Sequence, residues 1–260
     1  MSEEDNSSDN SKEEDPAFEH IMDLEVKKLE KSEKERLERM NELSSKLQIT
    51  KENKERAQIL DLIGEFSTYA EITTILIDIA LEDKYQLCRT KAVSLLADLI
   101  SEEEVKRTIL QTLSDSSQQV RLWSVWALRS IIHDVDVRDI LIRKLKFGEV
   151  SNRVKLWIIR TLSDLINDEE VMYAFLSLLK SKPNTEMRKL LLYYILQKAE
   201  NPEITFVLST HIQNETNKEI RREIVKKLIQ LDNEDVNYAL ERLMKTEKDE
   251  ETLELLKIKF

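Results

Sequence analysis

The chain has 260 residues with only 2 glycines, 3 prolines and 1 cysteine, and a formal net charge of −11. Average usage would give roughly 18 glycines. Phosphate-cradling loops and β-hairpin turns both depend on glycine, so glycine-loop enzymes and all-β folds are disfavoured, and one cysteine excludes a disulfide framework. The chain is 41% hydrophobic and 35% charged and has no apolar signal core, so we expect a soluble cytoplasmic protein.

The first 15 residues, MSEEDNSSDNSKEED, hold seven acids and one lysine and almost no apolar side chain. Such a segment cannot bury enough surface to fold, so residues 1–15 are predicted to be a disordered acidic tail. The tail either only keeps the chain solvated or serves as a docking or self-shielding segment.

Residues 16–50 are predicted to form one long charged N-terminal helix. An a/d-like apolar stripe is interrupted in its middle by Glu33 and Arg36. Three alternatives stay open, namely packing on the start of the main domain, a coiled-coil dimer, and a mobile helix. The stripe consists of Met22, Val26, Leu29, Met40, Leu43 and Leu47.

From residue 51 to residue 260 the chain repeats. A basic residue that follows an apolar one recurs at 89, 121, 155, 188 and 221, in steps of 32, 34, 33 and 33. Each opens a helix-period pattern whose core face is expected at −1, +3, +7 and +10, with apolar residues at +7 throughout and at +10 in all but one case. We call these the B helices, at about 86–100, 118–132, 152–166, 184–199 and 217–231, with an initial one at 51–66 and a truncated one at 249–259.

A second helix per repeat, the A helix, lies between successive B helices and shows apolar rows spaced by four. The A helices cover about 72–80, 105–113, 137–145, 171–179, 204–212 and 236–244. Capping-box spacing favours Ser101 and Asn167 as N-caps, and Asn201-Pro202-Glu203 combines a cap, a proline at the first helical position and an acid.

A two-helix unit of 33 residues cannot bury its apolar face alone, so about six units are expected to stack. QQVRLWSVWALRSII (118–132) and SNRVKLWIIRTLSDLI (151–166) resemble the second helix of the short HEAT or armadillo-type repeat family. The resemblance implies a right-handed all-α solenoid with the B helices on its concave side. The family's turn aspartate is matched by Asp83 and Asp115 but not at 149–155 or 182–188, which leaves the inter-repeat hydrogen-bond ladder in doubt there.

The B-helix positions +2, +5, +6 and +9 are expected to face the groove. All three tryptophans fall there, and either they line a binding patch or the helix phase is off by one and they are core. The residues expected to bind a partner are Trp123, Trp126, Trp157, Arg160, Asp164, Tyr193 and Gln197.

The B helices also carry a basic excess, which reflects either helix-dipole complementation or a groove for an acidic peptide or nucleic acid. We expect a non-catalytic scaffold for a protein partner, with no cofactor, no metal and no membrane. The second candidate is nucleic-acid binding, since HEAT-like DNA glycosylases use groove tryptophans, an aspartate and an arginine, although the spacing and charge here do not match. Related short repeats occur in phycobilin lyases, but no residue here supports that role specifically.

Overall fold

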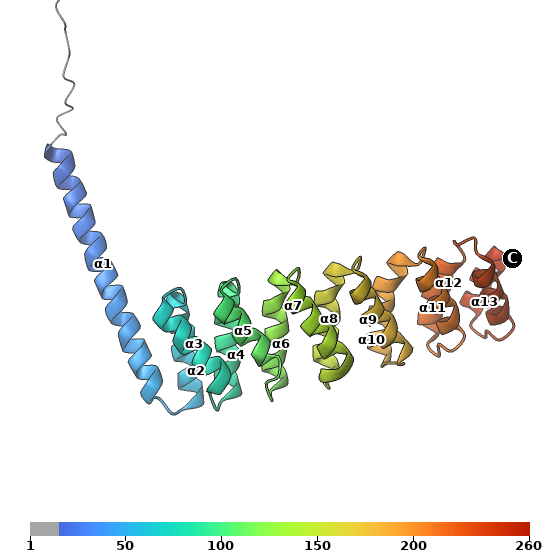
Figure 1. Ribbon diagram of the computed structural model, residues 1–260, viewed down its shortest axis with the longest axis horizontal. Coiled ribbons are helices and arrows are strands. Elements are labelled where there is room, and N and C mark those ends of the chain that lie inside the picture. Colours follow the sequence, from blue (N-terminus) through green and yellow to red (C-terminus); the bar gives the residue numbers. More distant parts are fainter. Residues whose placement is uncertain (1–15) are drawn as a thin grey trace, which may run out of the picture. The chain divides into compact units, whose positions relative to one another are not determined.

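In the computed structural model, the described residues, 16–260, form fourteen α-helices and no strand, which confirms the all-α class (Figure 1). The predicted acidic tail, 1–15, lies outside the described residues, as do the side chains of Met22 and Val26. The chain divides into two compact units. The first unit ends at Ile72, and the second unit runs from Thr73 to Phe260. The predicted domain boundary at residues 50 and 51 stays a prediction. The helices are α1 (Pro16–Ile49), α2 (Asn53–Ile63), α3 (Ala70–Glu82), α4 (Gln86–Leu96), α5 (Glu103–Thr112), α6 (Gln118–Leu128), α7 (Val135–Arg143), α8 (Asn152–Leu162), α9 (Glu169–Lys180), α10 (Thr185–Ile195), α11 (Pro202–Ile212), α12 (Lys218–Leu228), α13 (Glu234–Met244) and α14 (Glu250–Lys259).

In the first unit, the C-terminal half of α1 packs on α2. Met40 and Leu47 are buried, whereas Leu29, nearer the N-terminus, is exposed. The two charged residues that interrupt the apolar stripe make the next contacts. Glu33 accepts a 2.9 Å hydrogen bond from the Tyr69 hydroxyl, and Arg36 lies over the same ring at 5.7 Å. The interruption is therefore a polar anchor for α1.

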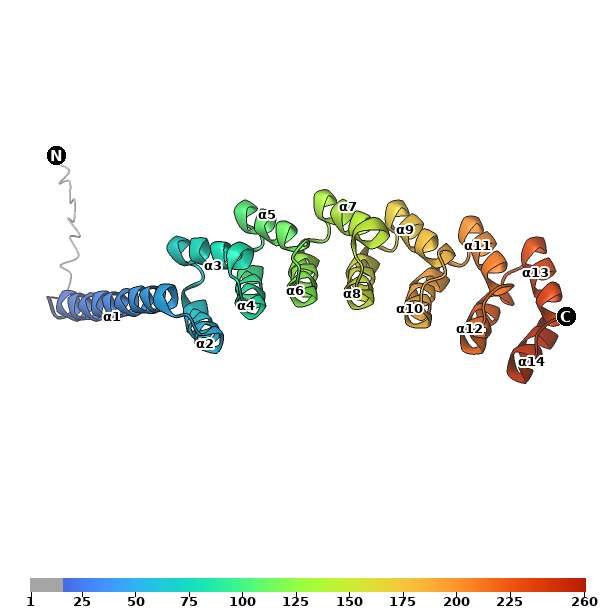
Figure 2. The same ribbon diagram turned by 90° about the horizontal axis from the view of Figure 1, so that it is seen from below.

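In the second unit, the predicted A helices are the odd-numbered helices from α3 to α13, and the B helices are the even-numbered ones from α4 to α14. They form two rows (Figure 2). Along the row of B helices, α4 packs closely on α6, α6 on α8, and α12 on α14. This repeated stacking is the predicted solenoid, with its core between the rows.

The core of each B helix lies at −1, +3, +4 and +7 from the basic residue, and in α6 these are Val120, Ser124, Val125 and Leu128, all of them buried. The predicted core position +10 is only half-buried, and Ile132 at +11 is buried in its place. Because α6 ends in a tighter 3-10 turn at Arg129–Ile131, the helical period changes there.

The helix N-caps follow the expected chemistry with two shifts in position. Asn201 caps α11 through bonds from the N–H groups of Glu203 and Ile204, as predicted. The predictions for α5 and α9 are wrong by one residue, since their N-caps are Glu102 and Asp168. Only Asp168 accepts hydrogen bonds through its side chain, which satisfies two amide groups that the helix leaves unpaired.

An arginine–carboxylate ladder joins successive repeats along the B helices. The guanidinium at the start of one B helix donates two hydrogen bonds of 2.7–2.9 Å to a carboxylate in the turn before the next B helix. A third bond from the same guanidinium reaches a carbonyl in the turn of its own repeat. Within the second unit, the rungs are Arg89–Asp115, Arg121–Glu149, Arg188–Glu215 and Arg221–Glu247.

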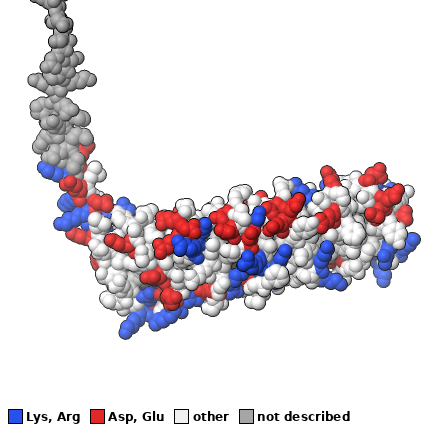
Figure 3. Space-filling view, in the orientation of Figure 1, with Lys and Arg blue, Asp and Glu red and all other residues white. Residues whose placement is uncertain are grey.

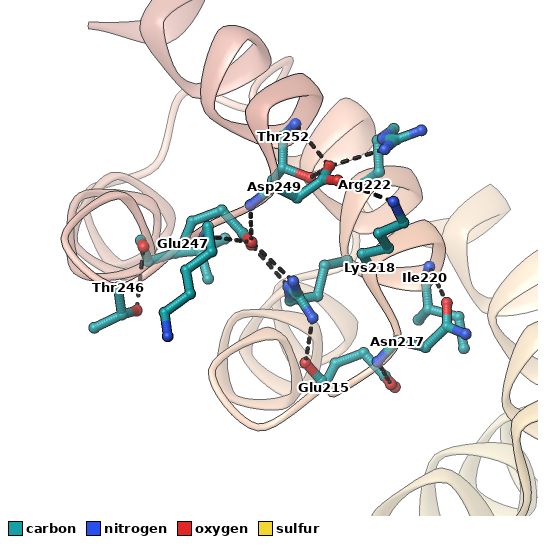
Figure 4. A network of polar contacts seen from close by, with 12 residues as sticks. Glu215, Asn217, Lys218, Ile220, Arg222, Thr246, Glu247, Asp249 and Thr252 are labelled. Atoms are coloured by element: carbon teal, nitrogen blue, oxygen red, sulfur yellow. Dashed lines mark hydrogen bonds and ion pairs between the residues drawn. The ribbon is translucent and has the colours of Figure 1, made fainter.

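Each carboxylate of the ladder is almost fully buried and also accepts a backbone N–H two residues later, as Glu247 does from Asp249 (Figure 4). The hydrogen bonds from Arg221 lower the pKa of Glu247 to about 2. Burial alone would raise the pKa of Glu149, but the bonds from Arg121 and from the Ser151 amide outweigh it and hold that pKa below its usual value. The ladder carboxylates are therefore ionised and fixed in place.

The doubt about the ladder at 149–155 is resolved, because Glu149 takes the place of the family's aspartate. A single π-helical turn, Lys144–Gly148, ends α7, and the Glu149 amide donates to the Lys144 carbonyl at 2.9 Å. This wider turn accommodates the longer step of 34 residues between Arg121 and Lys155 and still delivers Glu149 to the ladder.

Within the second unit, the ladder is interrupted between α8 and α10. Lys155 stands where the other B helices carry arginine, and Lys182 stands where their partners carry a carboxylate. Lys182 adopts φ 56°, and Arg188 bonds the carbonyl of Pro183 and not that of Lys182, so this turn has a different path. Within the described residues, Lys155 pairs with no carboxylate.

None of the helices in residues 16–260 combines the length and the apolar character that crossing a membrane requires.

Candidate functional site

The surface of the B helices, which we call the B-helix face, exposes positions +5 and +9 of the repeat. Trp126 is 44% exposed and Tyr193 65%, and Arg160, Asp164 and Gln197 are also exposed. Trp123 and Trp157, at +2, are half-buried. The aromatic residues are thus neither all core nor all free. The prediction for +6 fails at Ala127 and Thr161, which are buried, whereas Tyr194 at the same position is half-buried.

Aromatic side chains on this face hold one another in fixed orientations. The rings of Trp123 and Trp126 meet edge to face at 5.1 Å, and those of Tyr193 and Tyr194 do the same at 5.1 Å. The Arg160 guanidinium lies 5.8 Å from the centre of the Trp157 ring. Such preorganised rings lose little conformational entropy when a partner covers them.

Three neighbouring hollows connect the predicted site residues. One of about 650 Å³ is lined by Trp126, Arg129 and Asp164, among others, and one of about 440 Å³ lies between α8 and α10. The second brings together five of the seven predicted residues: Trp157, Arg160, Asp164, Tyr193 and Gln197. Because Asp164 lines both hollows and Trp123 touches Trp126, all seven predicted residues lie on one continuous surface.

Sequence reasoning missed the third and largest hollow, of about 690 Å³, between α10 and α12. Its apolar floor includes Leu192, Leu196 and Ile220, and its rim carries charges of both signs. It also missed Arg129, which bridges to Asp164 at 3.4 Å across the first hollow. Arg129 and Leu196 both occupy position +8, and a register that included this position could have found them.

The basic excess of the B helices is less available than the sequence indicated. The helices α8, α10 and α12 carry ten basic and three acidic side chains. Arg188 and Arg221 are held in the ladder, and Arg222 bonds Asp249 at 2.8 Å. Arg160 differs, because it is exposed and no carboxylate of the described residues pairs with it.

The groups that could carry catalysis lie apart. Cys88 is fully buried in α4, and His211 is part of the ladder network through Glu215. Among the described residues, no cluster of three His, Cys, Asp or Glu side chains could hold a metal ion. What this face offers is aromatic surface, the exposed Arg160 guanidinium and three hollows, an arrangement that can bind another molecule by burial and hydrogen bonding.

No family model matches the sequence, and no curated protein matches it. Among solved structures, one similar chain comes from "A conserved phosphorylation switch controls the interaction between cadherin and beta-catenin in vitro and in vivo"; it is 14% identical, with a TM-score of 0.43, over 81% of this chain and 50% of that one. Another comes from the complex of CpcE and CpcF of phycocyanin lyase from Nostoc sp. PCC7120, 14% identical, with a TM-score of 0.41, over 81% of this chain and 90% of that one. The chain spans half the length of the first of these, and at these values neither likeness decides what this chain binds or does.

Proposed function

We propose that this protein is a non-catalytic scaffold that binds a protein partner on its B-helix face. The observation that carries the proposal is the continuous surface of exposed and half-exposed aromatic side chains over adjoining hollows. Tryptophan, tyrosine and arginine dominate the energetics of protein interfaces, and Trp126, Arg160 and Tyr193 combine these types with exposure. The HEAT-like assignment itself stays a resemblance in the repeat motif.

The binding energy is expected to centre on Trp157 and Arg160. Replacing both with alanine removes the stacked guanidinium and the wall of the hollow between α8 and α10. We expect affinity capture from native lysate to lose the partner, with affinity reduced by about thirtyfold or more. Thermal unfolding, followed by circular dichroism, should change little because Arg160 is exposed.

Two further variants make this test sharp. Arg153→Ala removes an exposed positive charge from the same helix outside the hollows and should capture the partner as the wild type does. Tyr193→Ala alters a side chain that is 65% exposed, so it should weaken capture without affecting folding. If only variants that unfold lose the partner, the aromatic residues serve the fold and the proposal fails.

Nucleic-acid binding is the second candidate, favoured by the ten basic side chains on α8, α10 and α12. Because several of them are neutralised by neighbouring carboxylates, we expect no shift of duplex DNA or RNA in a gel at low salt and no glycosylase activity. Binding that weakens steeply with added salt would replace the protein-partner proposal with this one.

A further inference from the structure

A second row of exposed aromatic side chains lies on the A helices. Tyr173 on α9, Phe206 on α11 and Tyr238 on α13 follow one another at 33 and 32 residues, and each is the fifth residue after its helix's N-cap. They are 52%, 65% and 68% exposed. We call these three residues the A-helix stripe.

The fold does not require aromatic residues at this position. The same position carries Arg107 on α5 and Asp139 on α7, and both form ion pairs on the surface of their own helices. Tyr173 has one interaction across repeats, since the Glu203 carboxylate raises the pKa of its hydroxyl. Phe206 has no polar group and exposes most of its ring, so neither hydrogen bonding nor burial explains its presence.

Hollows lie beside the stripe as they do on the B-helix face. Tyr173 lines one of about 390 Å³ between α9 and α11, together with Met172 and Leu176. Phe206 and Tyr238 line another of about 440 Å³ between α11 and α13. Successive exposed rings over hollows mark a surface that can bury apolar or cationic groups of a partner.

The charge around the stripe is acidic. The helices α9, α11 and α13 carry six acidic side chains against two basic ones, the reverse of α8, α10 and α12. Exposed Glu169, Glu203 and Asp235 lie about one turn before the three rings. In Figure 3 acidic side chains gather along the upper edge of the repeat unit. An aromatic face next to a carboxylate attracts a lysine or arginine head group through the ring and through the ion pair together.

We propose that the A-helix stripe is a second docking surface, and that it binds a lysine- and arginine-rich segment of a partner protein. The two rows of helices would then present faces of opposite charge, and the chain would bridge two different partners. This inference does not depend on the function proposed for the B-helix face.

The test uses the full chain and a fluorescein-labelled peptide of repeating Lys-Arg-Leu triplets, followed by fluorescence anisotropy. We expect saturable binding that falls roughly tenfold in the double variant Phe206→Ser/Tyr238→Ser, which leaves the charge unchanged. Glu203→Gln/Asp235→Asn should weaken binding similarly. The double variant Trp157→Ala/Arg160→Ala should bind the peptide as the wild type does, which separates this surface from the B-helix face.

The matched control lies on α5, which begins with Glu103 and Glu104 but carries no aromatic residue at the stripe position. Glu103→Gln/Glu104→Gln removes the same number of acidic charges and should leave the affinity unchanged. Equal weakening by this control would mean general attraction to an acidic protein and would overturn the proposal. So would wild-type affinity in the serine variant, or a wild-type dimer in sedimentation that the serine variant abolishes, because the stripe would then bind a second copy.

Discussion

Glu149→Gln is expected to lower the free energy of unfolding by about 3 kcal/mol, at the lower end of the range for breaking a buried ion pair. The Glu149 side chain is 2% exposed and receives two bonds from the Arg121 guanidinium, itself only 13% exposed. The amide keeps one acceptor but removes the counter-charge, so Arg121 stays buried and unneutralised. Urea unfolding can be followed by tryptophan fluorescence, because all three tryptophans lie on α6 and α8, the helices that this rung joins.

The interrupted rung supplies the matched control. Lys182 occupies the position in its turn that Glu149 occupies in another repeat, and it takes part in no ladder pair. Lys182→Gln creates the same amide side chain and should leave the urea midpoint within experimental error. An unchanged urea midpoint in Glu149→Gln, as in Lys182→Gln, would show that the rung of Arg121 and Glu149 contributes nothing to stability.

Sequence periodicity was sufficient to place the helices of the repeats. An apolar position every three or four residues, restarted every 33 residues by a basic side chain, leaves little freedom for another helical arrangement. Periodicity failed where the local helix type changes. The 3-10 turn after α6 moved the core from Ile131 to Ile132, and no spacing of apolar residues indicates such a turn in advance.

The sequence revealed only the basic partner of each ladder pair. The recurring basic residue is plain, but its acceptor lies 26–28 residues later and is either aspartate or glutamate. Glu149 reaches its position through a π-helical turn that could not be predicted from the sequence. A pattern that requires aspartate therefore misses three of the four rungs, although the physical requirement, a buried carboxylate two residues before an N-cap, is met each time.

The sequence predicted which residues lie on the B-helix face, but it did not predict how exposed each side chain is. The register placed Trp126 and Trp157 on one face of their helices, yet one is exposed and the other half-buried. That difference follows the position in the repeat, because Trp126 lies at +5 whereas Trp157 lies at +2, where Trp123 is half-buried as well. The A-helix stripe was not predicted, because the apolar rows spaced by four mark the buried positions of the A helices and the stripe residues lie between those rows.

The stability of the repeat unit is expected to fall in two stages as the pH is lowered, and the first stage depends on His211. Its Nε2 lies 3.0 Å from Glu215, a ladder carboxylate that also receives Arg188. Burial lowers the pKa of His211, and the positive charges of Arg188 and Lys182 act in the same direction, while Glu215 opposes them without prevailing. The unfolded chain therefore takes up the proton first, and stability declines as the pH falls below about 6.5.

The second stage belongs to the ladder. The pKa values of Glu149, Glu215 and Glu247 are all held below their usual value, and that of Glu247 is lowered to about 2. A lowered carboxyl pKa contributes stability above the unfolded value near 4.5, and this stability is lost as the pH falls through the folded value. Urea midpoints measured from pH 7 to pH 3 should thus decline gently at first and steeply below about pH 4.5.

His211→Gln should abolish the gentle decline between pH 7 and pH 5 and preserve the steep one, since the amide can still donate to Glu215 but does not titrate. His133→Gln is the control, because His133 is exposed and should leave both stages in place. Retention of the first stage in the His211 variant would show that another group causes it.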